Sequence, residues 1–197
     1  MGTDEVLLER WVAGETRAGE ELVERHFQAI WRFFRSKVRD DVDDLVQQVF
    51  LGCVESRERF RAASSFRTYL FGVARHKLYR YLREQRKNAQ IDFGVTSLPG
   101  LGTSPTGAVE RDDRRRLILE ALQRLPVSQQ LVIELTYWEG LSGPEVAEVM
   151  AAPIDTVYTW LRRGKANLRS HLQAAKLGDM DAAALMRELH TCQSSIA

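Results

Sequence analysis

The stretch from Gly94 to Gly107 constrains the fold most, because no regular element can run through it. It contains four glycines and two prolines in 14 residues. Glycine is conformationally permissive, and proline lacks the N–H group that a helix interior needs. We therefore expect two folded modules joined by a flexible linker. The predicted boundaries are residues 1–90 for the first module, 91–110 for the linker, 111–176 for the second module and 177–197 for a C-terminal tail.

The first module is predicted to contain three amphipathic helices, because its apolar residues recur every three or four positions. Asp40 and Asp41 precede the second helix, where carboxylates stabilise a helix N-terminus, and Ser64 or Ser65 is placed to cap the third. The apolar stripes are Leu22, His26, Ile30, Phe33 and Phe34; Val42, Leu45, Val46, Val49, Phe50 and Val54; and Phe66, Tyr69, Leu70, Val73, Ala74, Leu78 and Leu82. Almost all of the chain has helical spacing of this kind, so we expect an all-α fold.

The second module contains a helix-turn-helix pattern. The run Ser142-Gly143-Pro144-Glu145 is a capping box that begins one helix, and Ala151-Ala152-Pro153 ends it. A second helix follows and ends in basic residues. Its outer faces carry side chains that can reach base edges and phosphates in a major groove, namely Tyr158, Thr159, Arg162, Arg163 and Lys165. Helical hairpins with a basic second helix also occur in proteins that do not bind DNA.

Positive and negative charges are segregated along the chain, although the formal net charge is only +1. Residues 1–56 hold 12 acidic and 7 basic residues, a net charge of −5. Residues 57–87 hold 10 basic and 2 acidic residues, a net charge of +8, and residues 156–176 hold five basic residues and no acidic one. Basic segments of this size indicate a polyanion as partner. The competing interpretation is that they are solvated helix faces.

The basic segment of the first module alternates its charges with aromatic residues, a composition that suits single-stranded or locally melted DNA. Tyr79 and Tyr81 point about 200° apart on a helix, so at least one of these rings is expected to be accessible. The helix before it carries Asp43, Asp44 and Gln47 on a face that would repel DNA and suit a positively charged protein partner. Alternatively, these carboxylates serve only the helix N-terminus.

Several classes of protein are disfavoured by the sequence. No apolar run reaches ten residues, so no membrane-inserted helix is expected, and the acidic start of the chain is unlike a signal peptide. The only cysteines, Cys53 and Cys192, favour a reducing cytoplasm over a disulfide framework. We expect no cofactor, no metal and no enzymatic activity. The acidic residues from Asp40 to Asp44 do not converge like the ligands of a two-metal nuclease, and no phosphate-binding glycine loop is present.

Three segments resemble a bacterial RNA polymerase sigma factor of the extracytoplasmic-function (ECF) type. DVDDLVQQVFLGCVESRERF is similar to the region-2 segment that docks on the polymerase clamp. SSFRTYLFGVARHKLYRYLREQRK is similar to the helix that melts the promoter and binds the −10 element. LQRLPVSQQLVIELTYWEGLSGPEVAEVMAAPIDTVYTWLRRGKANLRSHL is similar to region 4, which reads the −35 element. The resemblance covers roughly residues 21–172, in the order that the family has.

The resemblance implies that two helical domains bind core RNA polymerase together and that particular residues contact polymerase and promoter. The clamp-docking residues would be Asp43, Asp44, Gln47 and Phe50. The −10 residues, some of them in a loop that captures a flipped base, would be Phe60, Arg61, Ser64, Arg67, Lys77, Arg80, Tyr81 and Arg83. The −35 residues would be Tyr158, Thr159, Arg162, Arg163 and Lys165. The implied partners are the clamp and flap of core RNA polymerase, promoter DNA and an anti-sigma factor.

The sequence departs from the family's usual residues at three positions. The family often has glutamate where Gln48 stands, which bears on the contact with the clamp. It often has basic residues where Tyr158 and Trp160 stand, which bears on the −35 base preference. The alternative function is that of an autonomous helix-turn-helix regulator, which would bind duplex operators as a dimer. Such a regulator needs a sensor or dimerisation domain, and no segment of the sequence has that pattern.

Overall fold

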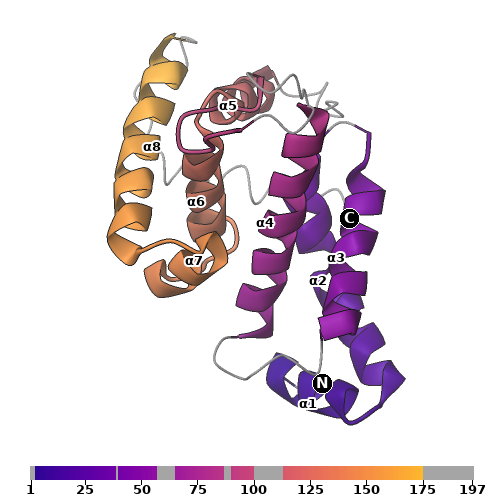
Figure 1. The fold of residues 1–197 in the computed structure, drawn as a ribbon. Coiled ribbons are helices and arrows are strands. Elements are labelled where there is room, and N and C mark those ends of the chain that lie inside the picture. Colours follow the sequence, from indigo (N-terminus) through magenta and orange to yellow (C-terminus); the bar gives the residue numbers. More distant parts are fainter. Residues whose placement is uncertain (1–2, 39, 57–64, 87–89, 100–112, 175–197) are drawn as a thin grey trace.

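A computed structural model describes residues 3–38, 40–56, 65–86, 90–99 and 113–174. Within these ranges the chain forms eight helices and no strand (Figure 1), which confirms the all-α fold class. The helices are α1 (Asp4–Val12), α2 (Thr16–Arg35), α3 (Val42–Ser56), α4 (Phe66–Gln85), α5 (Asp113–Gln123), α6 (Val127–Tyr137), α7 (Gly143–Met150) and α8 (Ile154–Ala174).

The first domain is formed by α1 to α4 around a common apolar core. Phe34 of α2, Val49 of α3 and Phe71 of α4 are fully buried in it. Burying a side chain of this size contributes about 1.5–3 kcal/mol. One of the two predicted caps is confirmed, because the Ser65 hydroxyl accepts a hydrogen bond from the backbone N–H of Thr68 at 3.1 Å. The three predicted amphipathic helices are therefore α2, α3 and α4.

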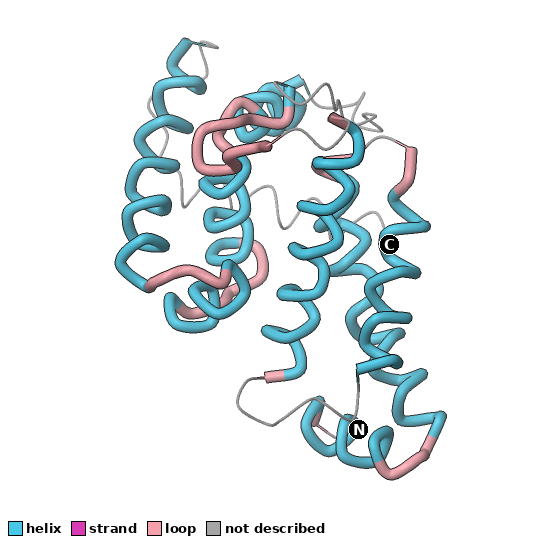
Figure 2. The backbone as a smooth tube through the Cα atoms, viewed as in Figure 1, coloured by secondary structure: helices cyan, strands magenta, loops and turns pink. Residues whose placement is uncertain are grey.

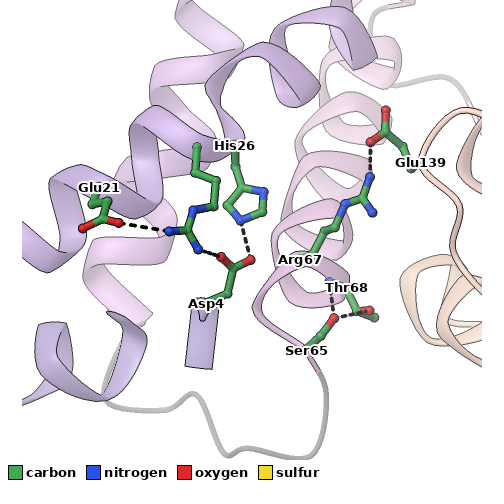
Figure 3. A network of polar contacts seen from close by, with 8 residues as sticks. Asp4, Glu21, His26, Ser65, Arg67, Thr68 and Glu139 are labelled. Carbon is green, nitrogen blue, oxygen red and sulfur yellow. Dashed lines mark hydrogen bonds and ion pairs between the residues drawn. The ribbon is translucent and has the colours of Figure 1, made fainter. Parts of the chain in front are cut away.

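The helix α1 is not among the predicted elements, because its nine residues are too few to show a clear apolar period. It packs on α2 through Trp11, whose indole lies so close to Gly19 that an added Cβ would overlap it. At its start, Asp4 Oδ1 accepts from Arg25 Nη1 at 2.5 Å, and Asp4 Oδ2 lies 2.6 Å from His26 Nε2 (Figure 3). A close helix contact and a partly buried polar network thus hold α1 against the domain.

The second domain is formed by α5 to α8. Ile118 of α5, Ile133 of α6 and Leu168 of α8 are buried in a shared apolar cluster. The helices α6 and α8 approach closely at Gly164, where an added Cβ would lie 2.9 Å from Ile133 Cδ1 and 3.4 Å from the carbonyl oxygen of Gln129. The missing side chain at this position therefore sets how closely α8 can approach α6.

The helices α7 and α8 form the predicted helix-turn-helix. The backbone N–H and the hydroxyl of Ser142 both donate to Glu145 Oε2, at 2.8 and 2.6 Å, so the predicted capping box is confirmed. Ala151 ends α7 with a left-handed φ of 48°, and α8 begins three residues later at Ile154. Figure 2 shows this connection as a short loop between the two helices.

Residues 90–99, the first part of the predicted linker, pack against both domains. Phe93 stacks on Tyr79 of α4 with the ring centroids 4.0 Å apart. The backbone N–H of Val127, the first residue of α6, donates to the carbonyl oxygen of Thr96 at 3.0 Å. This segment forms no regular element, as its glycine and proline content predicts, but ring stacking and backbone hydrogen bonds hold it between α4 and α6.

The two domains pack against each other along α4. This helix lies between α3 and α7 (Figure 1) and contacts both. Val132 and Leu135 of α6 and Val146 and Val149 of α7 belong to the same buried apolar cluster as Phe71 of the first domain. The hydrophobic core is therefore continuous from one domain into the other.

Candidate nucleic-acid interface

The outer face of α8 carries the five residues predicted to contact duplex DNA. Tyr158, Arg162 and Lys165 are spaced four and three residues apart, so they share one side of the helix, and all three are exposed. Arg163 is also exposed, and Thr159 is half-buried beside them. A major groove admits one α-helix, and donors on its outer face can reach base edges and phosphates. The structure therefore presents the predicted side chains together on an accessible helix.

The ring of Tyr158 is held against the start of α7. An added Cβ at Gly143 would lie 3.0 Å from the ring carbons Cε1 and Cζ. The other side of the residue is open, since 51% of Tyr158 is exposed. The helix-turn-helix thus fixes an aromatic ring and a hydroxyl group on the outer face of α8.

The predicted −10 residues of α4 fall on different sides of the helix. Arg80 and Arg83 are exposed to solvent. Lys77 and Tyr81 are half-buried and turn toward α3 and the loop before it. Burial, together with a hydrogen bond to Asp41, raises the pKa of Tyr81 to about 12, so this phenol remains protonated and able to donate. Only the exposed pair is directly available to a nucleic acid in this arrangement.

A third side of α4 faces the second domain and carries Arg67, Arg75 and Tyr79. Arg67 Nη2 donates to Glu139 Oε2 at 2.6 Å (Figure 3). Arg75 Nη1 donates to the carbonyl oxygen of Met150 at 2.6 Å, while its Nε is buried with no partner within the described part of the chain. Burial lowers the pKa of Arg75, although an arginine stays charged at neutral pH. Two arginines of the basic helix are therefore bonded to the second domain, and both are half-buried.

Arg75 is a candidate functional residue that the sequence prediction did not include. It stands eight residues after Arg67, about two helical turns, and this spacing is the signal that could have placed both on one side of the helix. Its guanidinium also lies over the Tyr79 ring, 5.3 Å from the centroid. An arginine beside an aromatic ring is the arrangement that binds the backbone and bases of a single strand.

The acidic face predicted on α3 is present on the surface. Asp43, Asp44 and Gln47 are exposed. Phe50, the fourth predicted member, is 8% exposed, as its place on the apolar stripe of α3 predicts, and it stacks on Phe27 of α2 with the ring centroids 6.4 Å apart. The structure therefore brings the three polar residues together and places Phe50 beneath them as part of the core.

An exposed apolar surface extends the acidic face. It consists of Phe27 of α2, 38% exposed, and Leu51 and Val54 of α3, 51% and 39% exposed. The prediction that Val54 lies on the buried stripe of α3 is wrong, because Val54 shares the outer face of the helix with Gln47 and Leu51, whereas Cys53 beside it is buried. Acidic and apolar side chains thus form one continuous surface on α2 and α3, typical of a protein interface.

Some predicted residues lie outside the described part of the chain. They are Phe60, Arg61 and Ser64, the linker beyond residue 99 up to residue 110, and the tail 177–197. Among the described residues, no group of three or more His, Cys, Asp or Glu side chains could hold a metal ion. None of the helices in that part has the length and hydropathy of a membrane span.

An exposed helix-turn-helix, a second basic helix bearing aromatic residues and a separate acidic surface together define a two-domain, all-α, DNA-binding protein. Two protein-family models match the chain and identify the family within this class. Residues 22–88 match sigma-70 region 2, and residues 115–168 match sigma-70 region 4. These two segments include α4 and the helix-turn-helix, respectively.

Curated relatives match nearly the whole chain. The RNA polymerase sigma factor NccH of Alcaligenes xylosoxydans xylosoxydans is 31% identical over 181 residues, which cover 88% of this chain and 97% of the relative. The ECF RNA polymerase sigma-E factor of Haemophilus influenzae is 30% identical over 181 residues, which cover 87% of this chain and 96% of the relative. The chain belongs to the ECF family of RNA polymerase sigma factors, which are DNA-binding factors for transcription initiation.

Solved structures show the same architecture. CnrH, in a complex with the cytosolic domain of CnrY, aligns with a TM-score of 0.64 at 27% identity and covers 88% of this chain and 99% of CnrH. The sigma factor RpoE of Bartonella quintana, in a complex with the anti-sigma factor NepR, aligns with a TM-score of 0.57 at 18% identity. It covers 78% of this chain and 96% of RpoE, and at that identity it supports the fold alone.

Proposed function

We propose that this sigma factor reads the −35 element with α8 and binds the melted −10 element with α4 while its α2–α3 surface docks on core polymerase. The observation that carries this proposal is the exposed row of Tyr158, Arg162 and Lys165 on the second helix of the helix-turn-helix. Phosphate contacts fix the register of such a helix on the duplex, and a few base contacts supply specificity. Thr159 and Arg163 flank this row and complete the −35 surface.

The −10 element is bound as an opened strand. Arg80 and Arg83 contact its backbone first. Lys77 and Tyr81 contact the strand after it has bound to α4. Extruding a base from the duplex costs a few kcal/mol, and stacking on an aromatic ring returns about 1–3 kcal/mol per base. Arg67 shares this role, and by resemblance Phe60, Arg61 and Ser64 belong to the loop that takes the flipped base.

Polymerase docking is assigned to Asp43, Asp44 and Gln47, with the exposed apolar side chains beside them. Carboxylates at the rim of an interface guide the approach of a basic partner and disfavour binding of acidic proteins. An apolar patch supplies surface that is buried on binding. Phe50 supports this surface from the core. The second domain would contact the flap of the same polymerase.

The two domains must separate for both promoter elements to be occupied. The −35 and −10 positions are about 25 base pairs apart, or about 85 Å at about 3.4 Å per base pair. The helix α4 is about 30 Å long and packs directly on α7, which precedes the −35 helix. A linker of about 20 residues reaches about 70 Å when extended, so it can bridge the domains once they part.

The chain acts in the cytoplasm as a dissociable specificity subunit without catalytic activity of its own, because core polymerase supplies the chemistry. CnrH and RpoE, the solved relatives, are bound to a protein partner, and the partner of RpoE is an anti-sigma factor. This chain has the same architecture, and we extend this kind of partner to it.

In vitro transcription with core polymerase tests the proposed function. The purified chain is added to core enzyme on a fragmented genomic template, and the start sites of the transcripts are mapped. We expect transcripts that begin at a small set of sites sharing two sequence elements, and only when both proteins are present. Specific DNA binding by the chain alone in a gel shift, with no transcripts, would instead support an autonomous regulator.

Reversing the charge at Asp44 should weaken docking on core polymerase. We expect Asp44→Arg to bind core enzyme at least tenfold more weakly in a quantitative pull-down, because a cation then faces a basic partner. Glu20→Arg is the matched control, since Glu20 is an exposed acid on α2 outside the docking surface. Equal affinity of the two variants for core enzyme would contradict the assignment.

A further inference from the structure

The first two turns of α8 expose two large apolar side chains beside the basic residues. The helix lies at the outer edge of the molecule (Figure 1), where Ile154 is 38% exposed and Tyr158 is 51% exposed. They stand four residues apart, so they share the side of the helix that carries Arg162 and Lys165. The side chain of Ile154 has no polar atom to offer to a phosphate. We call Ile154 and Tyr158 the apolar pair, and it suits a different contact in the groove from that of the neighbouring cations.

The ring of Tyr158 is positioned by the absence of a side chain at Gly143, the first residue of α7. An added Cβ at Gly143 would lie 2.6 Å from the Tyr158 hydroxyl oxygen and 3.0 Å from Cε1 and Cζ, so the hydroxyl end of the ring lies in the space that a side chain would fill. Gly143 does not have the positive φ of Gly140, so its own backbone does not require glycine. The small residue therefore serves the position of the ring, whose hydroxyl group is turned toward α7.

We propose that Ile154 and Tyr158 recognise thymine in the −35 element through its C5 methyl group. This inference deepens the proposed function of α8 and rests on it. The thymine methyl is the apolar group in the base-pair pattern of the major groove, and it is contacted by apolar side chains. Under the apolar pair, a thymine buries methyl against carbon. A cytosine would instead bring its amino group there, which would lose water without gaining a hydrogen-bond partner.

The place of the apolar pair along α8 favours contact with bases over contact with the DNA backbone. The N-terminal residues of a recognition helix are the ones that contact base edges. Asp155, which follows Ile154 in the first turn, is exposed, and its carboxylate would repel a phosphate. Four helical residues rise about 6 Å, which is nearly two base-pair steps of about 3.4 Å. The pair therefore reads two thymines that are close together in the −35 element.

Exchange of thymine for uracil tests the proposal, because it removes the methyl group and leaves base pairing unchanged. The probe is the strongest promoter found in the genomic transcription assay. It is prepared as a series of fragments in which each thymine of the −35 element, on either strand, is replaced in turn by deoxyuridine. Core polymerase with the full-length chain is titrated onto each fragment, and the half-saturating concentration is measured. A fragment with deoxyuridine between the two promoter elements controls for the exchange itself.

We expect the wild type to lose affinity about three- to fivefold at each of two thymines, the loss that corresponds to one buried methyl group. Tyr158→Ala should abolish the loss at one of them and Ile154→Ala at the other. Tyr158→Phe should keep the wild-type pattern, because the ring makes the contact. Gly143→Ala should reduce the loss at the Tyr158 thymine, because the added methyl displaces an otherwise intact ring. Val6→Ala is the matched control, since Val6 is 44% exposed on α1 of the other domain, and it should keep the wild-type pattern.

The proposal is overturned if no thymine of the −35 element is sensitive in the wild type, or if Tyr158→Ala and Ile154→Ala retain every wild-type loss. An equal loss of affinity by Tyr158→Phe on all fragments also overturns it, because the hydroxyl group then binds the backbone. So does weaker binding of Ile154→Ala to core polymerase in a pull-down, since the apolar pair then packs on protein. If Tyr158→Ala binds too weakly to measure, Gly143→Ala decides in its place.

The proposed function is scored before the fragments are prepared. Failure of the wild type to direct transcription from any genomic site counts against the sigma-factor mechanism itself. Transcription from defined sites without sensitivity to the thymine methyl groups counts against the apolar pair alone, so the two failures are distinguishable.

Discussion

The variant Arg162→Glu is expected to lose promoter-directed transcription at least tenfold while its affinity for core polymerase stays unchanged. Arg162 is exposed at the centre of the row formed with Tyr158 and Lys165, so its guanidinium is placed to enter the groove. One good base contact by arginine contributes about 1–3 kcal/mol, which alone corresponds to a loss of about five- to 150-fold. A glutamate also repels the neighbouring phosphates. Run-off transcription and a core pull-down on the same preparation measure the two quantities.

A matched charge reversal provides the control for this variant. Arg17 is exposed on α2, in the other domain, and Arg17→Glu should leave transcription within about twofold of the wild type. If Arg162→Glu transcribes as well as Arg17→Glu, then α8 does not read the promoter through this face. Loss of core binding in parallel with transcription would equally contradict the role assigned to Arg162.

The variant Phe71→Ala should destabilise the protein by about 3–5 kcal/mol, because it removes a fully buried ring and leaves a cavity. The Phe71 ring meets Phe33 of α2 edge-on, with the centroids 5.8 Å apart, and lies in the cluster that continues into α6 and α7. At about 2–4 °C per kcal/mol for a chain of this size, Tm should fall by about 6–20 °C. Thermal melting followed by circular dichroism measures this change.

The variant Val95→Ala is the control for cavity formation, because Val95 is 73% exposed in the linker segment. Its Tm should lie within about 2 °C of the wild-type value. If the Tm of Phe71→Ala equals that of Val95→Ala, then the common core of α2, α4 and the second domain does not hold the molecule together in solution.

The elements that carry function could be predicted from sequence because their signals are local. The Ser142–Glu145 capping box, the apolar spacing of α7 and α8 and the cap at Ser65 all lie within a few residues of the structure that they specify. The exposed faces with Asp43 and Arg162 followed from helical phase alone. The basic and acidic segments also reflect neighbouring residues, so charge counting located both of them.

The packing of the two domains could not be predicted because its signals are distant in sequence. Lys37 and Glu134, which form an ion pair between the domains, are 97 residues apart, and each alone has the pattern of an ordinary surface charge. The same holds for Arg75, whose contact with Met150 is 75 residues away. The apolar period of α3 placed Phe50 correctly in the core, but it failed for Val54, which lies at the edge of the stripe and is 39% exposed.

The stacked pair of Phe93 and Tyr79 has a consequence for how a strand would enter. The centroid of the Phe93 ring lies 4.0 Å from the centroid of Tyr79 and 5.3 Å from the Arg83 guanidinium. A bound nucleobase would have the same kind of surroundings. An incoming base that displaces it exchanges one aromatic contact for another of similar strength, so little affinity is lost in the substitution. In the proposed binding of a strand by α4, Phe93 would therefore compete with an incoming base for the face of Tyr79.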